Sequence, residues 1–261
     1  MCGNRRRTAR DGREGVVPVV KIMNSLRAPT TRLQPKVKIT GRVVGDWMRL
    51  FEANIGHAVP LLTDLDRAIG DGDHGVNIYR GMQSVVSKLA ELKSPDLSSQ
   101  LRVISAALTS SVGGASGPLY GAFFLQSAQV VLYKSEIALA DLILLVDAGC
   151  QGVVKLGKAA VGDKTMVDTL SAAVISLRES GLRRDSLSAA LAACSLAAQR
   201  AAEGTTPMVA RKGRASYLGE RSAGFQDPGA TSAQMLFEAL AQAVALSLLP
   251  SPTHSNPSVS P

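Results

Sequence analysis

Residues 62–75 read LTDLDRAIGDGDHG, and they separate two segments in which apolar side chains recur with the period of an α-helix. These segments cover about residues 40–62 and 75–92. Apolar residues make up 46% of the chain, but aromatic residues only 4%. Alanine and leucine, which dominate the apolar set, enter helices at little cost, whereas sheets favour β-branched and aromatic residues. The composition therefore predicts an all-α protein.

The helical period continues through the central region of the chain. Six more helices are predicted, at about 97–111, 117–133, 137–156, 164–180, 185–204 and 228–248. Helices joined by short loops pack as antiparallel neighbours. We therefore expect one domain over residues 39–249, built as an eight-helix antiparallel barrel or bundle.

The connections between these helices are of two kinds. The second, fourth and sixth are short and plain. The first, third, fifth and seventh are rich in glycine and charge, and they read LTDLDRAIGDGDHG (62–75), SVGGASGP (111–118), LGKAAVGDKT (156–165) and TTPMVARKGRASYLGERSAGFQDPGA (205–230). Alternate loops of an up-and-down bundle lie at the same end. These four loops should therefore meet, which predicts a ligand site at one end of the bundle.

The first of these loops concentrates carboxylates. It contains Asp64, Asp66, Asp71, Asp73 and His74, interleaved with Gly70, Gly72 and Gly75. Close carboxylates repel each other unless a cation neutralises them, and oxygen ligands favour magnesium or calcium. A calcium EF-hand does not fit, because the twelfth position counted from Asp71 is Met82 instead of the required glutamate. For the DGD sequence alone, a solvated turn is the alternative.

Two further loops carry weaker signals for phosphate binding. Residues 113–117 are small and precede a helix that opens with Pro118, which is typical of an anion site formed by main-chain amides. Residues 157–165 read GKAAVGDKT, one residue away from the P-loop pattern. Because Asp163 interrupts that pattern and a helix precedes it, we exclude a P-loop. Lys164 is left open between a phosphate contact and a solvated lysine.

The seventh connection adds a basic cluster and a helix start. Its basic residues are Arg211, Lys212, Arg214 and Arg221. An arginine can donate two parallel hydrogen bonds to phosphate oxygens, although a solvated loop is the default for such a cluster. Asp227 and Pro228 have the order of an N-cap followed by the first helical residue. Together, the carboxylates, the amides and the basic cluster predict a nucleotide-phosphate site.

The net charge of +8 lies entirely in the N-terminal leader. Residues 1–38 hold ten of the 29 basic residues and two of the 21 acidic ones, so the remaining 223 residues carry 19 of each sign. We therefore expect no nucleic-acid binding by the domain. The leader is predicted to be disordered, with a mitochondrial transit peptide or a true start at Met23 as alternatives. Residues 250–261 are predicted to form a Pro/Ser-rich disordered tail.

The chain shows no sign of a membrane or of an oxidising compartment. No segment reaches about 18 uncharged apolar residues, the length that a membrane span requires. The three cysteines, Cys2, Cys150 and Cys194, are odd in number and widely spaced. Such spacing provides neither a disulfide framework nor a metal site. We expect a cytoplasmic protein.

Four motifs, in order and at matching spacing, resemble those of the DhaL family, the ADP-binding subunits or domains of dihydroxyacetone kinases. They are LTDLDRAIGDGDHGVN (62–77), SSVGGASGP (110–118), GDKTM (162–166) and KGRASYLGERSAGFQDPGATS (212–232). The resemblance covers about residues 40–248. It implies a barrel of eight antiparallel helices with a nucleotide at one end, in agreement with the arrangement of the loops.

The resemblance also implies the residues of the site. Asp66, Asp71 and Asp73 would hold two Mg²⁺ ions that bridge the phosphates of ADP or ATP. Together with Arg214, these aspartates would form the catalytic set. Nucleotide contacts are implied at His74, Gly75, Val76, Asn77, Ala115, Ser116, Gly157, Met166, Arg214, Asp227, Pro228 and Gly229. Val76 departs from the leucine or alanine type of the family, so only its main-chain amide is expected to matter.

The implied function is that of a nucleotide-carrying kinase subunit. Such a subunit passes a phosphoryl group to dihydroxyacetone held covalently by a histidine of a DhaK-type partner. The segments GGASGPLYG and KGRASYLGERS favour the type in which a DhaM-type subunit of the phosphotransferase system rephosphorylates bound ADP. The alternatives are an ATP-dependent kinase subunit for dihydroxyacetone or another small ketose, and a nucleotide-dependent regulator of a transcription factor. The oligomeric state, a homodimer included, stays open.

Overall fold

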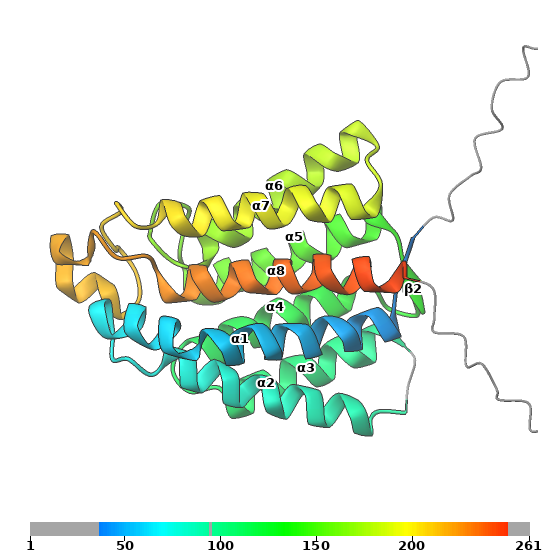
Figure 1. Cartoon of the computed structure of the whole chain (residues 1–261), viewed down its shortest axis with the longest axis horizontal. Coiled ribbons are helices and arrows are strands. Elements are labelled where there is room, and N and C mark those ends of the chain that lie inside the picture. The colour runs from blue at the N-terminus through cyan, green and yellow to red at the C-terminus, as the bar shows by residue number, and fades with distance from the viewer. Residues whose placement is uncertain (1–36, 94–95, 250–261) are drawn as a thin grey trace, which may run out of the picture. The chain divides into compact units, whose positions relative to one another are not determined.

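The computed structural model describes residues 37–93 and 96–249, in which eight α-helices follow one another (Figure 1). They are α1 (Gly41–Ile69), α2 (His74–Glu91), α3 (Leu97–Ser111), α4 (Ser116–Val130), α5 (Leu139–Gly157), α6 (Met166–Arg183), α7 (Leu187–Gly204) and α8 (Pro228–Ser247), with a 3-10 helix, η2 (Arg214–Ser222), before the last. Two short strands, β1 (Ile39–Thr40) and β2 (Glu136–Ile137), pair antiparallel. The all-α prediction is confirmed. The predicted leader, apart from its last two residues, and the predicted tail lie outside the described residues.

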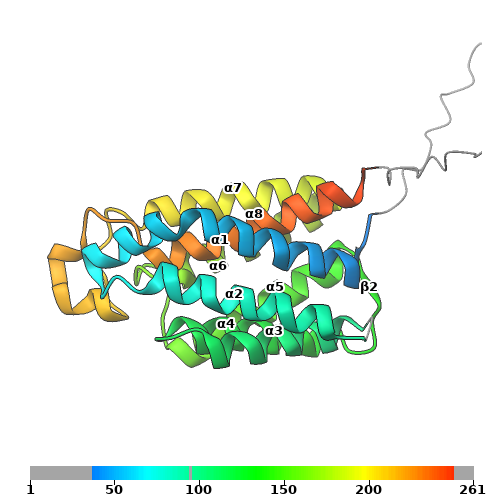
Figure 2. The ribbon, with the colours of Figure 1, turned by 60° about the horizontal axis from the view of Figure 1, so that its bottom comes forward.

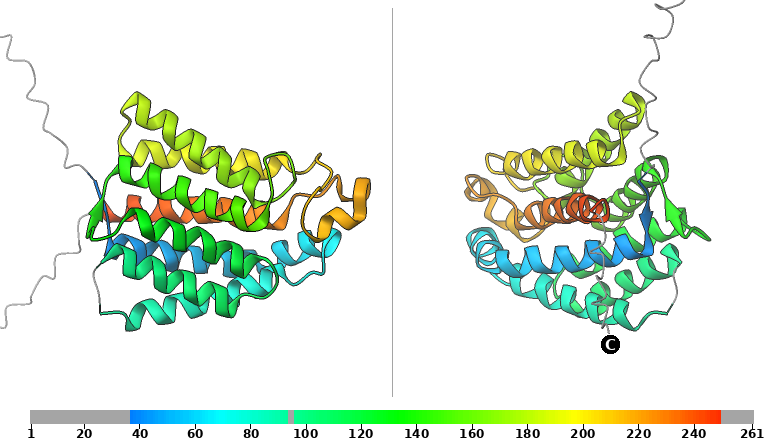
Figure 3. Two further views of the ribbon diagram at one scale, coloured as in Figure 1. Left: turned by 180° about the vertical axis from the view of Figure 1, so that it is seen from behind. Right: turned by 45° about the vertical axis from the view of Figure 1, so that its right-hand side comes forward.

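The eight helices close into a ring. Each helix packs against its neighbours in the chain, and α8 packs against both α7 and α1. Figures 1 and 2 show successive helices running side by side. The strand pair lies at the end of the helices away from η2, as the view from behind in Figure 3 also shows. The predicted eight-helix antiparallel barrel is confirmed.

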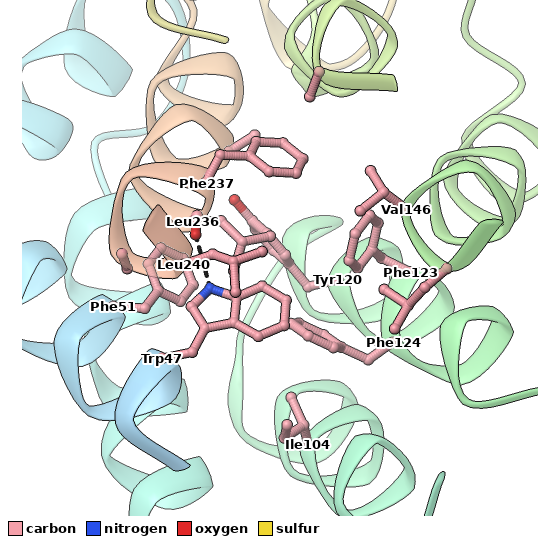
Figure 4. Close-up of a cluster of buried hydrophobic side chains, with 14 of the residues drawn as sticks. Trp47, Phe51, Ile104, Tyr120, Phe123, Phe124, Val146, Leu236, Phe237 and Leu240 are labelled. Carbon is pink, nitrogen blue, oxygen red and sulfur yellow. Dashed lines mark hydrogen bonds between the residues drawn. The ribbon is translucent and has the colours of Figure 1, made fainter. Parts of the chain in front are cut away.

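Large aromatic side chains fill the interior of the ring (Figure 4). The most deeply buried are Trp47, Phe51, Tyr120, Phe123, Phe124 and Phe237. The indole of Trp47 on α1 donates a hydrogen bond of 2.8 Å to the main-chain oxygen of Leu236 on α8. Its ring centroid lies 5.7 Å from that of Phe124 on α4. Most aromatic residues of the chain therefore pack between helices from different sides of the ring.

Helix α1 extends further than the sequence predicts. It ends at Ile69 instead of residue 62, and it continues through Pro60. The aspartates of this stretch predict a loop, and that prediction is wrong because residues 62–69 keep the helical period. The last two turns place Asp66 on the buried face of the helix and Asp64 in solvent. The metal-type carboxylates thus come partly from a rigid helix.

The seventh connection contains a helix that the sequence does not predict. Residues 214–222 form η2, which is interrupted at Gly219, where φ is 55°. Its first residue, Arg214, lies at the end of the ring away from the strand pair. Within the described ranges, no helix is both long enough and apolar enough to cross a membrane.

Candidate functional site

A cavity of about 170 Å³ opens at the end of the ring where the four glycine-rich and charged connections lie. Every one of these connections contributes to its lining. Examples are Asp71 and Asp73, Gly113 and Gly114, Lys164 and Thr165, and Lys212 and Gly213. The predicted meeting of the four connections at one end of the ring is confirmed.

Three carboxylates converge on one wall of this cavity. One oxygen atom each from Asp66, Asp71 and Asp73 can be chosen so that all lie within 4.8 Å of one another. Asp66 is oriented by the turn that follows it, because its Oδ2 accepts hydrogen bonds from the main-chain N–H groups of Asp73 (2.8 Å) and His74 (3.1 Å). Hard oxygen ligands at this spacing suit a divalent cation such as Mg²⁺. The predicted convergence of the three aspartates is therefore present.

Two glycines permit the turn that brings these carboxylates together. A Cβ atom at Gly70 would lie 2.2 Å from Oδ1 of Asp66, so any side chain at this position would displace the carboxylate. Gly72 has a φ of 77°, in the left-handed region that favours glycine. The interleaved glycines of the sequence are thus required by the geometry of the turn.

Arg214 lies at the rim of the cavity beside the carboxylates. Its guanidinium group forms an ion pair with Asp71, and its side chain remains 57% exposed. Gly213, with a φ of 69°, turns the chain into η2 immediately before it. The arginine offsets part of the negative charge of the three carboxylates. It can also donate two parallel hydrogen bonds to phosphate oxygens.

Four helices begin at the cavity. Their first residues, which all line it, are His74 of α2, Ser116 of α4, Met166 of α6 and Pro228 of α8. The first turn of a helix leaves main-chain N–H groups without helical acceptors, and the helix dipole adds positive potential there. Helix N-termini directed at one cavity form a binding site for phosphate-like anions. The loop sequence indicates this arrangement most clearly at α4, where Gly114 has a φ of 68°.

His74 is buried beside the carboxylates and is hydrogen-bonded at both ring nitrogens. Its Nδ1 lies 3.1 Å from Oγ of Ser116, and its Nε2 lies 3.0 Å from Oγ of Ser232. The Ser232 hydroxyl lies 2.8 Å from that of Tyr120 in the core. Burial lowers the pKa of His74, although the negative charges of Asp66 and Asp73 raise it. Ser232 and Tyr120 thus support the site from α8 and α4. Both lie in segments that carry the family resemblance, but neither is among the predicted site residues.

Asp227 forms the N-cap of α8, as predicted. Its Oδ2 accepts a hydrogen bond of 2.7 Å from the main-chain N–H group of Ala230, and Pro228 follows at the start of the helix. The carboxyl group is buried. Burial raises the pKa of Asp227 to about 7, although the hydrogen bond from Ala230 and the charge of Lys164 lower it.

Replacing Asp227 by asparagine is expected to remove part of the pH dependence of stability. Because the pKa of Asp227 in the folded protein lies above its ordinary value of 3.8, its contribution to the free energy of unfolding falls as the pH rises from about 4 to about 7. Asparagine retains a capping oxygen but does not titrate. Between about pH 5 and 7, the free energy of unfolding of the wild type should fall by roughly 1.4 kcal/mol per pH unit relative to that of the variant, as measured by urea unfolding. If the free energies of unfolding of the two proteins differ by the same amount at every pH in this range, the prediction is wrong.

The family model of the DAK2 domain matches residues 68–242. The chain belongs to the DAK2 domain family. The chain is 49% identical over 182 residues to "PEP-dependent dihydroxyacetone kinase, ADP-binding subunit DhaL" of Escherichia coli (strain K12), a match that covers 70% of the chain and 87% of the relative. It is 41% identical over 197 residues to the corresponding subunit of kinase 1 of Listeria innocua, covering 75% of this chain and 93% of the relative.

A solved structure with a similar fold contains a nucleotide analogue. It is the dihydroxyacetone kinase from C. freundii in complex with AMP-PNP and Mg²⁺, with a TM-score of 0.61 and 26% sequence identity. The likeness covers 92% of this DAK2 domain chain but only 38% of the solved chain. The resemblance to the DhaL family is confirmed by these relatives.

The two readings of Lys164 in this DAK2 domain both need correction. The side chain lies beside the cavity but is completely buried, so it is not a solvated lysine. Its ammonium group donates hydrogen bonds to the main-chain oxygens of Thr205, at 2.7 Å, and Phe225. These bonds direct it away from a role as a phosphate ligand. A helix, α5, precedes this connection, in agreement with the exclusion of a P-loop.

A second cavity of about 250 Å³ adjoins the first, and the two linings share Ala115, Leu119, Thr165, Met166, Lys212 and Gly213. Its other walls are mainly apolar, with Pro118, Val153, Leu156, Ala159 and Val167. Gly157, a predicted nucleotide contact, lies here. An apolar cavity of this kind suits a flat aromatic group. The sequence does not reveal this wall, because its residues come from three different helices of the DAK2 domain and the connection after α5.

Three predicted contacts, Gly75, Val76 and Asn77, do not line either cavity. A Cβ atom at Gly75 would lie 2.6 Å from a main-chain oxygen of α1, so close packing of α1 and α2 already requires the glycine. Asn77 is buried, and its Oδ1 accepts a hydrogen bond of 2.8 Å from Arg80. Its Nδ2 points towards Gly113 in the third connection. Nucleotide contacts at these positions of the DAK2 domain stay predictions.

Proposed function

We propose that this chain carries the nucleotide for a dihydroxyacetone kinase. It holds ADP or ATP with Mg²⁺ and passes a phosphoryl group to dihydroxyacetone bound on another subunit. The observation that carries the proposal is the convergence of Asp66, Asp71 and Asp73 beside four helix N-termini. The phosphates of a Mg-nucleotide need both features, because they bind cations and main-chain amides. The relatives named as ADP-binding subunits and the similar structure that holds AMP-PNP and Mg²⁺ support this function.

The three carboxylates are proposed to hold two Mg²⁺ ions. When bound, the ions neutralise negative charge on the phosphates. Asp66 suits the role of a fixed ligand, because two main-chain N–H groups orient it from the end of α1. Asp71 and Asp73 are exposed and lie on the glycine-rich turn, so they can adjust to the position of a cation. The residues present therefore fit the metal.

Phosphoryl transfer requires mainly positioning and charge stabilisation from a protein. The helix N-termini are proposed to bind the phosphate oxygens. The nucleotide contacts proposed at the starts of these helices are His74, Gly75, Val76, Asn77, Ala115, Ser116, Asp227, Pro228 and Gly229. Arg214 is proposed to stabilise charge on the transferring group, because it stands at the rim where an acceptor from another subunit can approach. The catalytic set is therefore Asp66, Asp71, Asp73 and Arg214.

The base of the nucleotide is proposed to occupy the second, apolar cavity. This cavity adjoins the carboxylate-lined one through Ala115 and Met166, so one extended ligand can span both. Gly157 and Met166 would then contact the base or the sugar next to it. The lining is apolar on most sides, which favours stacking and burial of a flat ring over recognition by many hydrogen bonds.

The sugar is proposed to bind on a DhaK-type partner subunit. Among the described residues, the lining of the first cavity includes one histidine, His74, and both its ring nitrogens are hydrogen-bonded to serines. It is therefore not placed to hold a carbonyl substrate covalently. A DhaM-type subunit is proposed to rephosphorylate the bound ADP, since the relatives quoted are PEP-dependent. Binding of a transcriptional regulator and homodimer formation stay predictions.

Purified protein is expected to retain ADP through gel filtration in the presence of Mg²⁺, because a nucleotide that serves as a coenzyme stays bound between turnovers. Chromatography of the denatured protein would identify the released nucleotide. With ATP and dihydroxyacetone, the chain alone should form no dihydroxyacetone phosphate, and a DhaK-type subunit should restore transfer. Turnover by the chain alone would contradict the partner assignment. Loss of nucleotide on the first column would favour the ATP-exchanging type of kinase.

A further inference from the structure

The side chain of Lys164 lies inside the protein among main-chain oxygens. It is completely buried, and its Nζ donates hydrogen bonds to the oxygens of Thr205 (2.7 Å) and Phe225, with a longer one to Thr206 (3.4 Å). An ammonium group has three N–H donors, so these acceptors match its capacity. The residue itself adopts a φ of 62°, which is uncommon for a residue other than glycine. Both features indicate a lysine held in place by its surroundings.

These bonds join two connections that are distant in sequence. Lys164 belongs to the connection between α5 and α6, whereas its acceptors lie 41, 42 and 61 residues further along the chain. Other bonds reinforce the same junction. The main-chain N–H group of Asp227 donates to Oγ1 of Thr205 (2.9 Å), and that of Gly224 donates to the oxygen of Thr206 (2.8 Å). Both ends of segment 205–227 are therefore tied to one buried ammonium group.

Segment 205–227 reaches across the end of the ring and carries part of the cavity wall. The middle of the segment contributes Lys212, Gly213 and Arg214 to the lining of the first cavity. Its last residue, Asp227, also lines this cavity. The segment's other attachments are few: a small apolar cluster of Ile69, Ala210 and Ala215, the ion pair of Arg214 with Asp71, and a main-chain hydrogen bond of 3.1 Å from Arg211 to Asp163. A segment with so little apolar packing opens more readily than the core. The buried bonds of Lys164 are thus a large part of what holds it.

We propose that Lys164 is a positioning residue that clamps segment 205–227 over the nucleotide cavity and thereby slows the release of the nucleotide. This inference rests on the proposed nucleotide site. A Lys164→Met variant keeps an unbranched side chain of similar length but loses the three donors. The oxygens of Thr205 and Phe225 would then lack their buried partner, and Asp227 would lose a nearby positive charge. The segment should open more often, and Arg214 should leave the cavity with it.

The test compares the release of Mg-ADP and the amide hydrogen exchange of the wild type and Lys164→Met. Release is followed by chasing bound, labelled ADP with excess unlabelled ADP. We expect release, and exchange within segment 205–227, to accelerate about ten-fold or more, because charged hydrogen bonds are lost. Exchange in α3 and α4 should not change. If Lys164→Met releases Mg-ADP and exchanges the amide hydrogens of segment 205–227 at the wild-type rates, the proposal is wrong.

Leu101→Ala is the matched control for a general loss of stability. Leu101 is buried in the half of α3 that lies away from the cavity, and it belongs to the main core. Its truncation should lower the unfolding temperature without changing the release of Mg-ADP. Equal acceleration of release in Leu101→Ala and Lys164→Met would overturn the positioning role, because it would show that stability alone sets the release rate.

Lys164→Gln covers the case in which Lys164→Met does not fold. The glutamine side chain is shorter than that of lysine and has two N–H donors. We therefore expect its rates of Mg-ADP release and of hydrogen exchange to lie between those of the wild type and those expected for Lys164→Met. No change in either measurement would overturn the proposal. If the wild type itself does not bind Mg-ADP, the proposed function fails, and hydrogen exchange within segment 205–227 still decides whether the clamp exists.

Discussion

Replacing Asp73 by alanine is expected to lower the affinity for Mg-ADP by at least about 100-fold while the helices stay folded. Removing a group that only supports a metal ligand already costs about 10- to 100-fold in metal affinity, so removing a ligand should cost more. Asp73 is exposed on the turn before α2 and makes no side-chain cap to that helix. The variant should therefore retain its circular dichroism spectrum, and calorimetric titration with Mg-ADP measures the loss.

Asp64→Ala provides the matched control for Asp73→Ala. Asp64 lies close in sequence to the three carboxylates, but it is exposed and pairs with Arg67 on the surface of α1. Its removal changes the net charge by the same amount without touching the cation site, so Mg-ADP should bind as in the wild type. An unchanged affinity in Asp73→Ala, or an equal loss in Asp64→Ala, would show that the metal assignment is wrong.

Arg214→Ala is expected to lower the rate of phosphoryl transfer by about 100- to 1,000-fold in the assembled kinase, the range found when a donor that stabilises developing charge is removed. Single-turnover transfer from bound Mg-ATP to dihydroxyacetone, with the partner subunit present, measures this rate. Because Arg214 pairs with Asp71, it also competes with a cation for that carboxylate. The variant should therefore bind Mg²⁺ alone at least as tightly as the wild type.

Arg221→Ala distinguishes this specific role of Arg214 from a general effect of charge. Arg221 lies near the other end of η2 and is exposed, so its loss removes the same charge from the same segment. We expect transfer at close to the wild-type rate. A similar fall in both variants, or a fall of less than about ten-fold in Arg214→Ala, would remove Arg214 from the catalytic set.

Much of the fold can be predicted from sequence because helices are encoded locally. The apolar period of α2 to α8 and the cap at Asp227 depend on residues within one or two turns, and both are confirmed. The end of α1 differs from its prediction for the same reason. Aspartates and glycine dominate residues 62–75 and predict a loop, whereas the period of Leu62, Asp66 and Ile69 continues the helix against the core.

The candidate site is predictable where it follows from chain topology. Alternating plain and glycine-rich connections place four loops at one end, and the three aspartates lie close enough in sequence to converge through one turn. The partners of His74 and Lys164 could not be inferred in this way. Ser232 lies 158 residues from His74, and Phe225 lies 61 residues from Lys164. No local spacing rule connects such pairs.

The amino-acid sequence alone predicts most of the helices, the end of the ring at which the functional loops meet, and the carboxylates that suit a cation. These follow from periodicity, connection length and side-chain chemistry, which act over short stretches of chain. Three features emerge only from the folded chain: Asp66 projects from a helix, Lys164 is buried among main-chain oxygens, and an apolar cavity adjoins the carboxylate-lined one. The reason is physical, since burial and hydrogen-bond partners depend on which distant segments the closed ring brings together.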